Sequence, residues 1–311
     1  MRANARFGEG LMSDFTIVVD TNCDLPEEYI SEYGIEIIPM PFELDGAPHS
    51  QGYWQKISGK EFYNALREGK VATTSQINPE FFISIFKDYA IQGRDAVFLL
   101  LSGGLSNTYN SALIAAREVK ESYPDSGIYI IDTINATVGH GLLAILAAKK
   151  RAEGFSAAET ARWLERKKHS CFGVFTVDDL MFLHRGGRLS KLSAIAGSVL
   201  RVKPILNLAP DGTLALKNKA RSKKNAMKMM IDQMKRSVNP DTRLDTVLIA
   251  HTDCAEDALV FADMIKDAAD PREIINMMVG PVIGAHLGPG ALVLLFEADM
   301  TREEYERKYY Q

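Results

Sequence analysis

Cysteine is scarce in this chain of 311 residues. The three that occur, Cys23, Cys171 and Cys254, lie far apart, and no Cys-x-x-Cys pair is present. The six histidines form no cluster with the spacing of metal ligands. These absences argue against a disulfide framework and a structural zinc site, so we expect a chain that folds without a metal in the reducing cytoplasm.

Long apolar runs are missing too. No run approaches the roughly 18 apolar residues that a membrane-spanning helix requires. The first 14 residues are polar and lack the apolar stretch of a secretory signal peptide. Residues 141–148 form the most apolar helical stretch, which is too short to span a bilayer and is typical of a buried helix. We therefore expect a soluble protein without an integral membrane segment.

Positive charge is not in excess. The chain carries 36 Lys and Arg against 40 Asp and Glu, and its formal net charge is −4. Nucleic acid usually requires a basic surface, so we do not expect it as a partner. The densest basic region consists of Lys217, Lys219, Arg221, Lys223, Lys224 and Lys228. We expect most of this region on a solvated helix face, although it could steer an anionic ligand or dock an acidic partner surface.

The motifs of several self-sufficient enzymes are absent as well. The sequence contains no Walker A motif, no spaced Gly-x-Gly-x-x-Gly fingerprint and no Gly-x-Ser-x-Gly elbow. It therefore offers no obvious machinery for hydrolysing ATP or an ester unaided.

What the chain does contain is an alternation of short apolar runs and amphipathic helical stretches. In the first half, the runs are those of strands buried on both faces of a parallel sheet; they lie at 15–20, 35–42, 96–101 and 128–132. Strands are expected in the second half at 172–177, 204–208, 213–216, 246–250, 274–279 and 292–298, with a hairpin at Asp211-Gly212 and helices at 219–238 and 255–268. We predict two α/β domains: residues 14–170 with a mostly parallel, doubly wound sheet, and residues 171–311 with a mixed sheet.

Two polar motifs follow predicted strands of the first half. Ser102-Gly103-Gly104-Leu105-Ser106-Asn107-Thr108-Tyr109 opens a helix that Ser106 can cap, and the free N–H groups of the first helical turn form a general anion site. Thr73-Thr74-Ser75-Gln76-Ile77-Asn78-Pro79 places three hydroxyls before a helix that Asn78 can cap, with Pro79 as its first residue. These hydroxyls could bind a polar ligand head, although for each motif alone a turn without a ligand is the simpler explanation.

A third motif, Asp20-Thr21-Asn22-Cys23-Asp24-Leu25-Pro26-Glu27, closes the first strand. Asp20 suggests a phosphoryl-transfer nucleophile of the haloacid-dehalogenase type, but that chemistry needs a second Asp at position 22, which is Asn. We interpret Asp24 with Glu27 as a helix N-cap and a favourable acid in the first turn.

Two glycine-rich motifs lie in the second half. His184-Arg185-Gly186-Gly187-Arg188-Leu189-Ser190 could contact phosphate or RNA, but we interpret it as a turn before a Ser-capped helix because the chain is acidic. Gly284-Ala285-His286-Leu287-Gly288-Pro289-Gly290 brackets one histidine. A lone histidine in a turn is usually structural, although so constrained a turn would hold the imidazole in one place.

In their joint order and spacing, these segments resemble the DegV family along nearly the whole chain. The matching segments are Val19-Asp20-Thr21 with Asp24-Leu25-Pro26, Thr74-Ser75-Gln76, Leu105-Ser106-Asn107-Thr108-Tyr109, Gly186-Gly187-Arg188-Leu189-Ser190, Lys203-Pro204-Ile205 and the motif around His286. The resemblance implies one long-chain fatty acid bound between two α/β domains, and no other cofactor. It also implies a separate ATP-dependent fatty acid kinase, which phosphorylates the bound carboxylate for phospholipid synthesis.

The resemblance also implies roles for single residues. Thr74 and Ser106 are expected to hydrogen-bond the fatty acid carboxyl group. Arg221 and His286 are expected to serve kinase-dependent phosphorylation and to complete the polar site from the second domain. We expect Arg221 to lie beside the site without clamping the ligand, because hydroxyl donors leave the carboxylate accessible to a kinase.

Ser75, Ser102 and Gly103 are further expected ligand-binding positions, and no residue is expected to be catalytic. Three positions depart from the family pattern. Asn107 stands where glycine is usual and tolerates a left-handed backbone. Gly103 stands where serine is frequent and removes one polar contact, and Asn78 replaces a small residue while keeping the helix cap.

Two other functions remain open from the residues alone. The first is an enzyme that acts on a phosphorylated small metabolite and uses the Ser106 turn as its phosphate site. The second is an interaction protein whose apolar cleft binds peptides.

Overall fold

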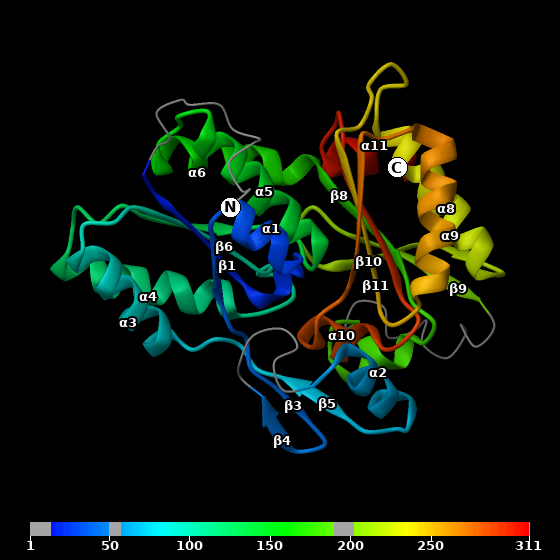
Figure 1. Cartoon of the computed structure of the whole chain (residues 1–311), viewed down its shortest axis with the longest axis horizontal. Coiled ribbons are helices and arrows are strands. Elements are labelled where there is room, and N and C mark those ends of the chain that lie inside the picture. Colours follow the sequence, from blue (N-terminus) through cyan, green and yellow to red (C-terminus); the bar gives the residue numbers. More distant parts are fainter. Residues whose placement is uncertain (1–13, 50–56, 190–201, 311) are drawn as a thin grey trace.

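The computed structural model describes residues 14–49, 57–189 and 202–310, and shows two α/β halves side by side (Figure 1). The first half contains a four-stranded parallel sheet with strand order β2-β1-β6-β7. The second half contains a six-stranded mixed sheet with strand order β10-β9-β8-β13-β11-β12. The predicted fold class, a mostly parallel sheet followed by a mixed sheet, is confirmed.

The strands of the parallel sheet are β1 (Thr16–Asp20), β2 (Ile35–Ile38), β6 (Ala96–Leu100) and β7 (Ile128–Asp132). Those of the mixed sheet are β8 (Cys171–Thr176), β9 (Lys203–Leu208), β10 (Leu214–Ala220), β11 (Thr246–His251), β12 (Glu273–Met278) and β13 (Leu292–Glu297). The helices of the first half are η1 (Thr21–Cys23), α1 (Glu27–Glu32), α2 (Gly59–Arg67), α3 (Pro79–Ile91), α4 (Thr108–Ser122), α5 (Val138–Ala152), α6 (Ala157–Lys167) and η2 (Lys168–Ser170). Those of the second half are α7 (Leu180–Arg185), α8 (Lys223–Ser237), α9 (Ala255–Ala269), α10 (Pro281–Leu287) and α11 (Arg302–Tyr309).

Both faces of the parallel sheet are covered, which explains why its central strands, β1 and β6, are mostly apolar. Alternate side chains of a strand point to opposite faces. In β1, Ile17 and Val19 pack into the core that contains α5, whereas Val18 packs into the core that contains α3 and α4. A polar side chain at any of these positions would be buried.

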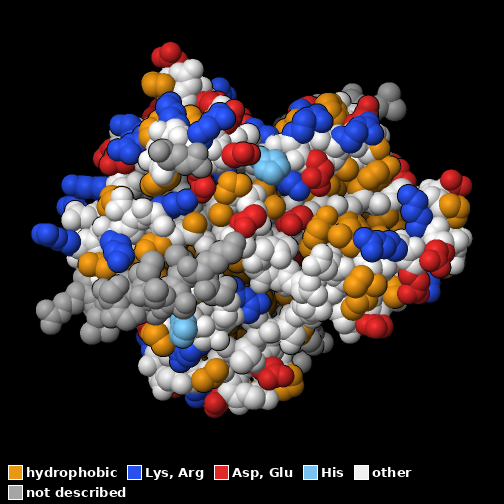
Figure 2. All heavy atoms as spheres, turned by 180° about the vertical axis from the view of Figure 1, so that it is seen from behind, with side chains coloured by type: hydrophobic (Ala, Val, Ile, Leu, Met, Phe, Trp, Pro, Cys, Tyr) orange, Lys and Arg blue, Asp and Glu red, His pale blue; other side chains and the backbone are white. Residues whose placement is uncertain are grey.

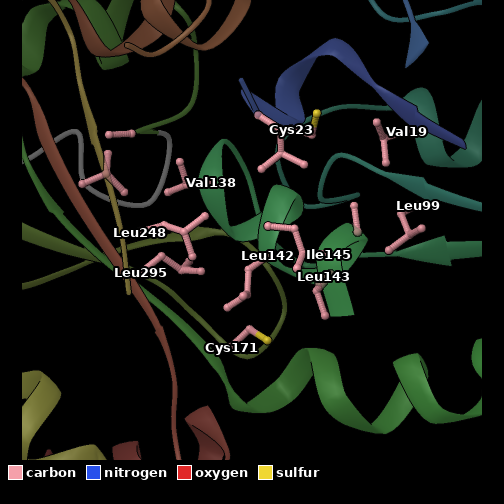
Figure 3. Packing of buried hydrophobic residues seen from close by; sticks show 14 of the residues in the cluster. Val19, Cys23, Leu99, Val138, Leu142, Leu143, Ile145, Cys171, Leu248 and Leu295 are labelled. Carbon is pink, nitrogen blue, oxygen red and sulfur yellow. The ribbon is translucent and has the colours of Figure 1, made fainter. Parts of the chain in front are cut away.

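Helix α5 joins the two halves through one continuous core. Figure 3 shows Val138 and Leu142 of α5 among Leu248 of β11 and Leu295 of β13, and Leu99 of β6 belongs to the same cluster. The halves are therefore packed on each other. The domain boundary near residue 170 stays a prediction; β8, the first strand of the second sheet along the chain, begins at Cys171.

The strand predicted over 35–42 is in fact two strands. Strand β2 ends at Ile38, and Pro39 and Pro41 interrupt the run because proline has no N–H for a strand ladder. The next strand, β3 (Phe42–Leu44), pairs with β4 (Ala47–His49) and β5 (Ala72–Thr74) in a small antiparallel sheet that we did not predict.

The helix predicted over 219–238 begins later, at Lys223, where Ser222 caps it by accepting a hydrogen bond from the Asn225 N–H. Strand β10 extends to Ala220, so the first part of the basic region lies on a strand and not on a helix. Lys217 forms an ion pair with Glu306. The solvated helix face predicted for this region is thus confirmed only for Lys224 and Lys228, since Lys223 is half-buried and forms ion pairs with Asp178 and Asp257.

Two turn predictions are confirmed. Asp211-Gly212 lies in the hairpin between β9 and β10, where Gly212 has a φ of 75°. Asn78 caps α3 by accepting a hydrogen bond from the Phe81 N–H, and Pro79 is the first residue of that helix.

The prediction that Asp24 caps α1 is wrong. Its backbone is left-handed, with a φ of 48°, and its carboxylate accepts a hydrogen bond from the Gly280 N–H, 2.9 Å away. The residue before α1 is Pro26, which makes no side-chain cap. Asp24 thus links the first half to the residue that precedes α10.

Asp20 is fully buried and accepts hydrogen bonds from the backbone N–H groups of Asn22 and Leu101, which supports a structural role.

The surface carries charges of both signs without a broad region of one sign on the face shown in Figure 2. None of the helices within the described ranges has the length and apolarity needed to cross a membrane.

Candidate functional site

A cavity of about 490 Å³ is lined by residues from both halves of the chain. Most of its wall is apolar. The mixed sheet supplies Phe175, Leu208, Leu214, Val293 and Leu295, and α10 supplies further aliphatic side chains. Gly173 of β8 also lines the cavity, and the missing side chain adds space there.

Polar side chains gather at one part of this wall. Thr74 stands at the end of β5, and His286 lies in the last turn of α10; their Oγ1 and Nε2 atoms are 2.8 Å apart. Helix α10 lies beside β5 and α2, below the two large sheets in Figure 1. The small antiparallel sheet thus brings Thr74 from the first half onto His286 from the second.

His286 is held as a neutral imidazole. Burial, with a smaller contribution from the nearby Arg188 charge, lowers the pKa of His286 to about 4. Its Nδ1 atom is buried and has no hydrogen-bond partner among the described residues. If Nε2 carries the ring proton, it donates to the Thr74 oxygen and leaves the Thr74 O–H free to donate to a ligand.

Ser106 lies on the loop between β6 and α4, and its side chain is almost fully buried. Its hydroxyl oxygen accepts a hydrogen bond from the Thr108 N–H at 3.3 Å and lies 3.0 Å from the Thr108 hydroxyl. Ser106 therefore serves the first turn of α4 as predicted, although the N-cap position itself is Asn107. Since Ser106 and Asn107 both line the cavity, the positive N-terminal end of α4 lies at the cavity wall.

The glycines of this loop are required by close packing. A Cβ on Gly104 would lie 2.7 Å from the Gly212 carbonyl carbon, and a Cβ on Gly103 would lie 2.8 Å from an Asp132 carboxylate oxygen. The Gly103 N–H donates to Asp132 at 3.1 Å. Gly103 itself lines the cavity, as does the expected site residue Ser75.

Two expected site residues do not line the cavity. Ser102 is fully buried and donates its hydroxyl to the Gly212 carbonyl oxygen at 2.9 Å, which ties the β6–α4 loop to the β9–β10 hairpin. Arg221 is exposed in the short turn between β10 and α8. The structure thus brings together Thr74, Ser75, Gly103, Ser106 and His286, whose roles in binding remain predictions.

Arg188 was not among the expected ligand-binding residues, but it lines the cavity near His286. Its Nε donates to the Leu105 carbonyl at 3.0 Å and its Nη1 to the Gly186 carbonyl at 2.5 Å. Partial burial lowers the pKa of the guanidinium. The signal was the Gly-Gly-Arg motif, which we interpreted as a turn; Ser190, the expected cap of the next helix, lies outside the described residues.

Thr137 was missed as well. It lines the cavity just before α5 with a φ of 48° and a ψ of −133°, a strained backbone for a β-branched residue. Ile134, in the same loop, also has a positive φ, of 47°. Sequence patterns carry no signal for such strain.

Arg302 of α11 holds this loop from the second half. Its Nη1 donates to the Ile134 carbonyl at 2.8 Å, and its Nη2 donates at 2.6 Å to both the Asn135 side-chain oxygen and the Cys171 carbonyl. The side chain is buried, which lowers the pKa of Arg302 to about 10. Arg302, which belongs to the second half, therefore stabilises the strained loop between β7 and α5 of the first half.

Within the part of the chain that the structure describes, no group of three or more His, Cys, Asp or Glu side chains is placed to hold a metal ion. The arrangement instead offers an apolar enclosure with neutral donors, one arginine and a helix N-terminus on one side. Such a site suits a ligand with an apolar body and one anionic end.

Comparison with known proteins gives consistent relatives. A family model described as "Uncharacterised protein, DegV family" matches residues 14–299. A DegV domain-containing protein of Clostridium perfringens is 39% identical over 293 residues, which cover 94% of this chain and 100% of that protein. A DegV domain-containing protein of Caldanaerobacter subterraneus is 34% identical and covers 92% of this chain and 99% of its own length.

Solved structures show the same architecture. A DegV family protein from Thermus thermophilus, described for its fatty acid binding, is 28% identical with a TM-score of 0.81, and the match covers 92% of this chain and 99% of that one. A stearic acid-binding protein from Eubacterium ventriosum is 26% identical with a TM-score of 0.80, and the match covers 94% and 99% of the two chains.

Proposed function

The chain belongs to the DegV family, and on this premise we propose that it binds one long-chain fatty acid in the 490 Å³ cavity, with the carboxylate at the polar wall. The observation that carries the proposal is the cavity itself, which is apolar over the mixed sheet and has Thr74, Ser106 and His286 in its polar lining. The fatty acids bound by the Thermus and Eubacterium relatives support it.

The apolar wall supplies the affinity. Burying each CH₂ group of the tail contributes about 0.8 kcal/mol, so a sixteen-carbon chain gains roughly 10 kcal/mol before the entropic cost of ordering. The cavity volume falls within the roughly 300–1,000 Å³ of pockets that enclose small ligands. Phe175, Leu208 and Leu295 are the side chains we expect against the tail.

The polar wall prevents the carboxylate from being buried without partners, which would be very costly. The Thr74 and Ser106 hydroxyls donate to its oxygens, His286 orients the Thr74 hydroxyl, and the positive end of α4 favours the negative charge. These neutral groups bind the head group without enclosing it in a salt bridge. Arg188, at the edge, adds a charge.

The chain is further proposed to be a carrier and not an enzyme on its own. A separate ATP-dependent kinase in the cytoplasm would phosphorylate the bound acid: a carboxylate oxygen attacks the terminal phosphorus of ATP, the new O–P bond forms, and ADP leaves. The product would enter phospholipid synthesis. Supporting this part are the family resemblance, the absence of a Walker A motif, and hydroxyl donors that leave the carboxylate reactive.

Extraction tests the proposal directly. The purified full chain is extracted with organic solvent, and the extract is examined by mass spectrometry. We expect about one long-chain fatty acid per chain. A chain free of fatty acid that also fails to bind one added in solution would overturn the proposal, and tightly bound phosphate in such a chain would favour an enzyme of phosphorylated metabolites. The kinase step is checked by adding a candidate kinase with ATP and measuring the acyl phosphate.

A further inference from the structure

We propose that fatty acid binding by this chain is linked to a proton on Asp24, a buried carboxyl group directly behind the wall of the acyl cavity. This linkage rests on the proposed function and deepens it, because it concerns the regulation of the same cavity by pH. Asp24 lies in the first half and accepts a hydrogen bond from the Gly280 N–H of the second, so its charge also acts where the halves meet.

A single layer of side chains separates Asp24 from the acyl cavity. Asp24 lines a narrow gap together with Met40 and Val282, and these two side chains also line the cavity. Met40 lies close to the polar part of the wall, because the carbonyl oxygen of the next residue, Pro41, accepts a hydrogen bond from the Ser75 N–H at 3.3 Å. A charge on Asp24 would therefore act on a ligand head group in the cavity.

The surroundings of Asp24 favour the neutral, protonated carboxyl group. The residue is only 4% exposed, and its Oδ2 atom has no partner at hydrogen-bond distance among the described residues. Its Oδ1 atom accepts one hydrogen bond, from the Gly280 N–H. Asp20 is equally buried but accepts three, from the backbone and side-chain N–H groups of Asn22 and from the Leu101 N–H. Since a buried carboxylate with so few donors is costly, Asp24 takes up a proton.

The pKa of Asp24 agrees with this geometry. Burial is the main reason why the pKa of Asp24 is raised to about 7. The Thr137 hydroxyl and the Gly280 N–H lower this pKa, and the negative charge of Asp20 raises it. No ion pair in the described part of the chain involves Asp24, so no cation holds the carboxylate in its charged form.

The other titratable groups around Asp24 do not change their charge near neutral pH. On α2, the pKa of Tyr63 is raised well above 10, mainly by burial, so the phenol stays protonated. On α5, His140 lies 3.7 Å from an Asp20 oxygen, and burial lowers the pKa of this imidazole below 6.5. The residues of α10 that line the gap with Asp24 carry no charge. We therefore assign a change of charge near pH 7 in these surroundings to Asp24.

The ligand head group and an ionised Asp24 carry the same charge, and like charges repel strongly across an apolar medium. Below about pH 7, Asp24 is neutral and does not oppose the head group; as the pH rises through about 7, Asp24 becomes negative and does. Fatty acid affinity therefore falls as the pH rises, and by thermodynamic reciprocity a bound fatty acid raises the affinity of Asp24 for its proton. His286 does not contribute in this range, because its pKa is about 4.

The test measures the affinity of the full chain for a sixteen-carbon fatty acid at about pH 6 and about pH 8.5, by displacement of a fluorescent fatty acid. We expect the parent to bind at least about fivefold more weakly at the higher pH. Asp24→Asn, which cannot ionise, should change less than about twofold. The control, Asp263→Asn on the exposed surface of α9, should behave like the parent.

Calorimetry of the same titration in two buffers with different heats of ionisation counts the protons that accompany binding. Near pH 7.5, we expect the parent and the control to take up part of a proton and Asp24→Asn to take up none. An affinity of the parent that does not depend on pH, or the same pH dependence in Asp24→Asn, would overturn the linkage and leave fatty acid binding intact. A parent chain that binds no fatty acid at either pH would refute both the linkage and the proposed function.

Discussion

At the scale of single residues, the contact between Thr74 and His286 decides whether the Thr74 hydroxyl is free to donate a hydrogen bond to a ligand. We predict that Thr74→Val, which keeps the shape but removes the hydroxyl, weakens fatty acid binding roughly 10- to 100-fold, because a hydrogen bond to a charged group contributes about 1.5–3 kcal/mol. Displacement of a fluorescent fatty acid measures the change. Thr242→Val, an exposed threonine before β11, is the matched control. Equal affinity of parent and Thr74→Val would remove Thr74 from the head-group site.

The low pKa of His286, about 4, predicts how the chain responds to pH. A histidine that titrates near 6.5 when unfolded and near 4 when folded contributes its full stability above pH 6.5 and loses it as the pH falls from about 6.5 to about 4. We therefore expect the His286 ring signals in NMR spectra to stay constant between pH 8 and pH 5.5. A midpoint near 6.5 would show that the ring is solvated.

The raised pKa of Asp24 predicts the opposite pH dependence, in which stability falls as the pH rises. Burial raises its pKa from 3.8 to about 7, so the folded chain holds a proton that the unfolded chain releases, and stability falls as the pH rises from about 4 to about 7. Asp24→Asn keeps an acceptor for the Gly280 N–H and cannot ionise. In urea unfolding, we expect this variant to be more stable than the parent at pH 8 and to lose that pH dependence, whereas Asp263→Asn on the exposed surface behaves like the parent. A less stable Asp24→Asn at pH 8 would contradict the account.

Only some residues of the polar cavity wall could be predicted from the sequence. Thr74, Ser106 and His286 belong to motifs with an excess of hydroxyls or a constrained turn, and such motifs are visible in a sequence. Arg188 also belongs to a visible motif, but its place at the cavity could not be predicted, because it depends on the fold that brings the loop after α7 to the β6–α4 loop. Ser102 and Ser106 are chemically alike, and only packing decides that one faces a hairpin and the other the cavity.

At the scale of elements, the strained loop between β7 and α5 depends on Arg302. Arg302→Met removes five donors and leaves several buried carbonyl groups unpaired, so we expect a loss of about 3–5 kcal/mol in the free energy of unfolding. Arg272→Met, which breaks an exposed ion pair with Asp245, should cost less than about 1 kcal/mol. Urea unfolding measures both. Similar losses in the two variants would show that Arg302 does not hold the loop.

Most elements were predictable because the strands of a sheet covered on both faces must be apolar runs. The exceptions have physical causes. Prolines divide the run after β2, and the small sheet with β3, β4 and β5 consists of strands too short to show a pattern. The helix predicted from residue 219 fails at its start, because Lys219 and Ala220 are compatible with a helix but pair in β10 with Pro204 and Lys203 of β9.

At the scale of the whole molecule, the cavity wall belongs to both halves, so a ligand stabilises their packing as well as its own site. A ligand at about 100 times its dissociation constant adds about 2.7 kcal/mol to the stability of the folded chain, which raises the melting temperature of a protein of this size by roughly 5 °C. We expect this rise when delipidated protein is reloaded with a sixteen-carbon fatty acid. The methyl ester, which has no charged head, should produce a smaller rise, and equal rises would show that the polar wall does not recognise the acid.

A crystal structure of the chain with a long-chain fatty acid bound would test most directly whether the cavity holds the acid as proposed. We expect carboxylate oxygens within hydrogen-bond distance of the Thr74 and Ser106 hydroxyls, and a tail that runs against Phe175 and past Gly173. A cavity closed by side chains, or an acid bound elsewhere with its head group in solvent, would contradict it.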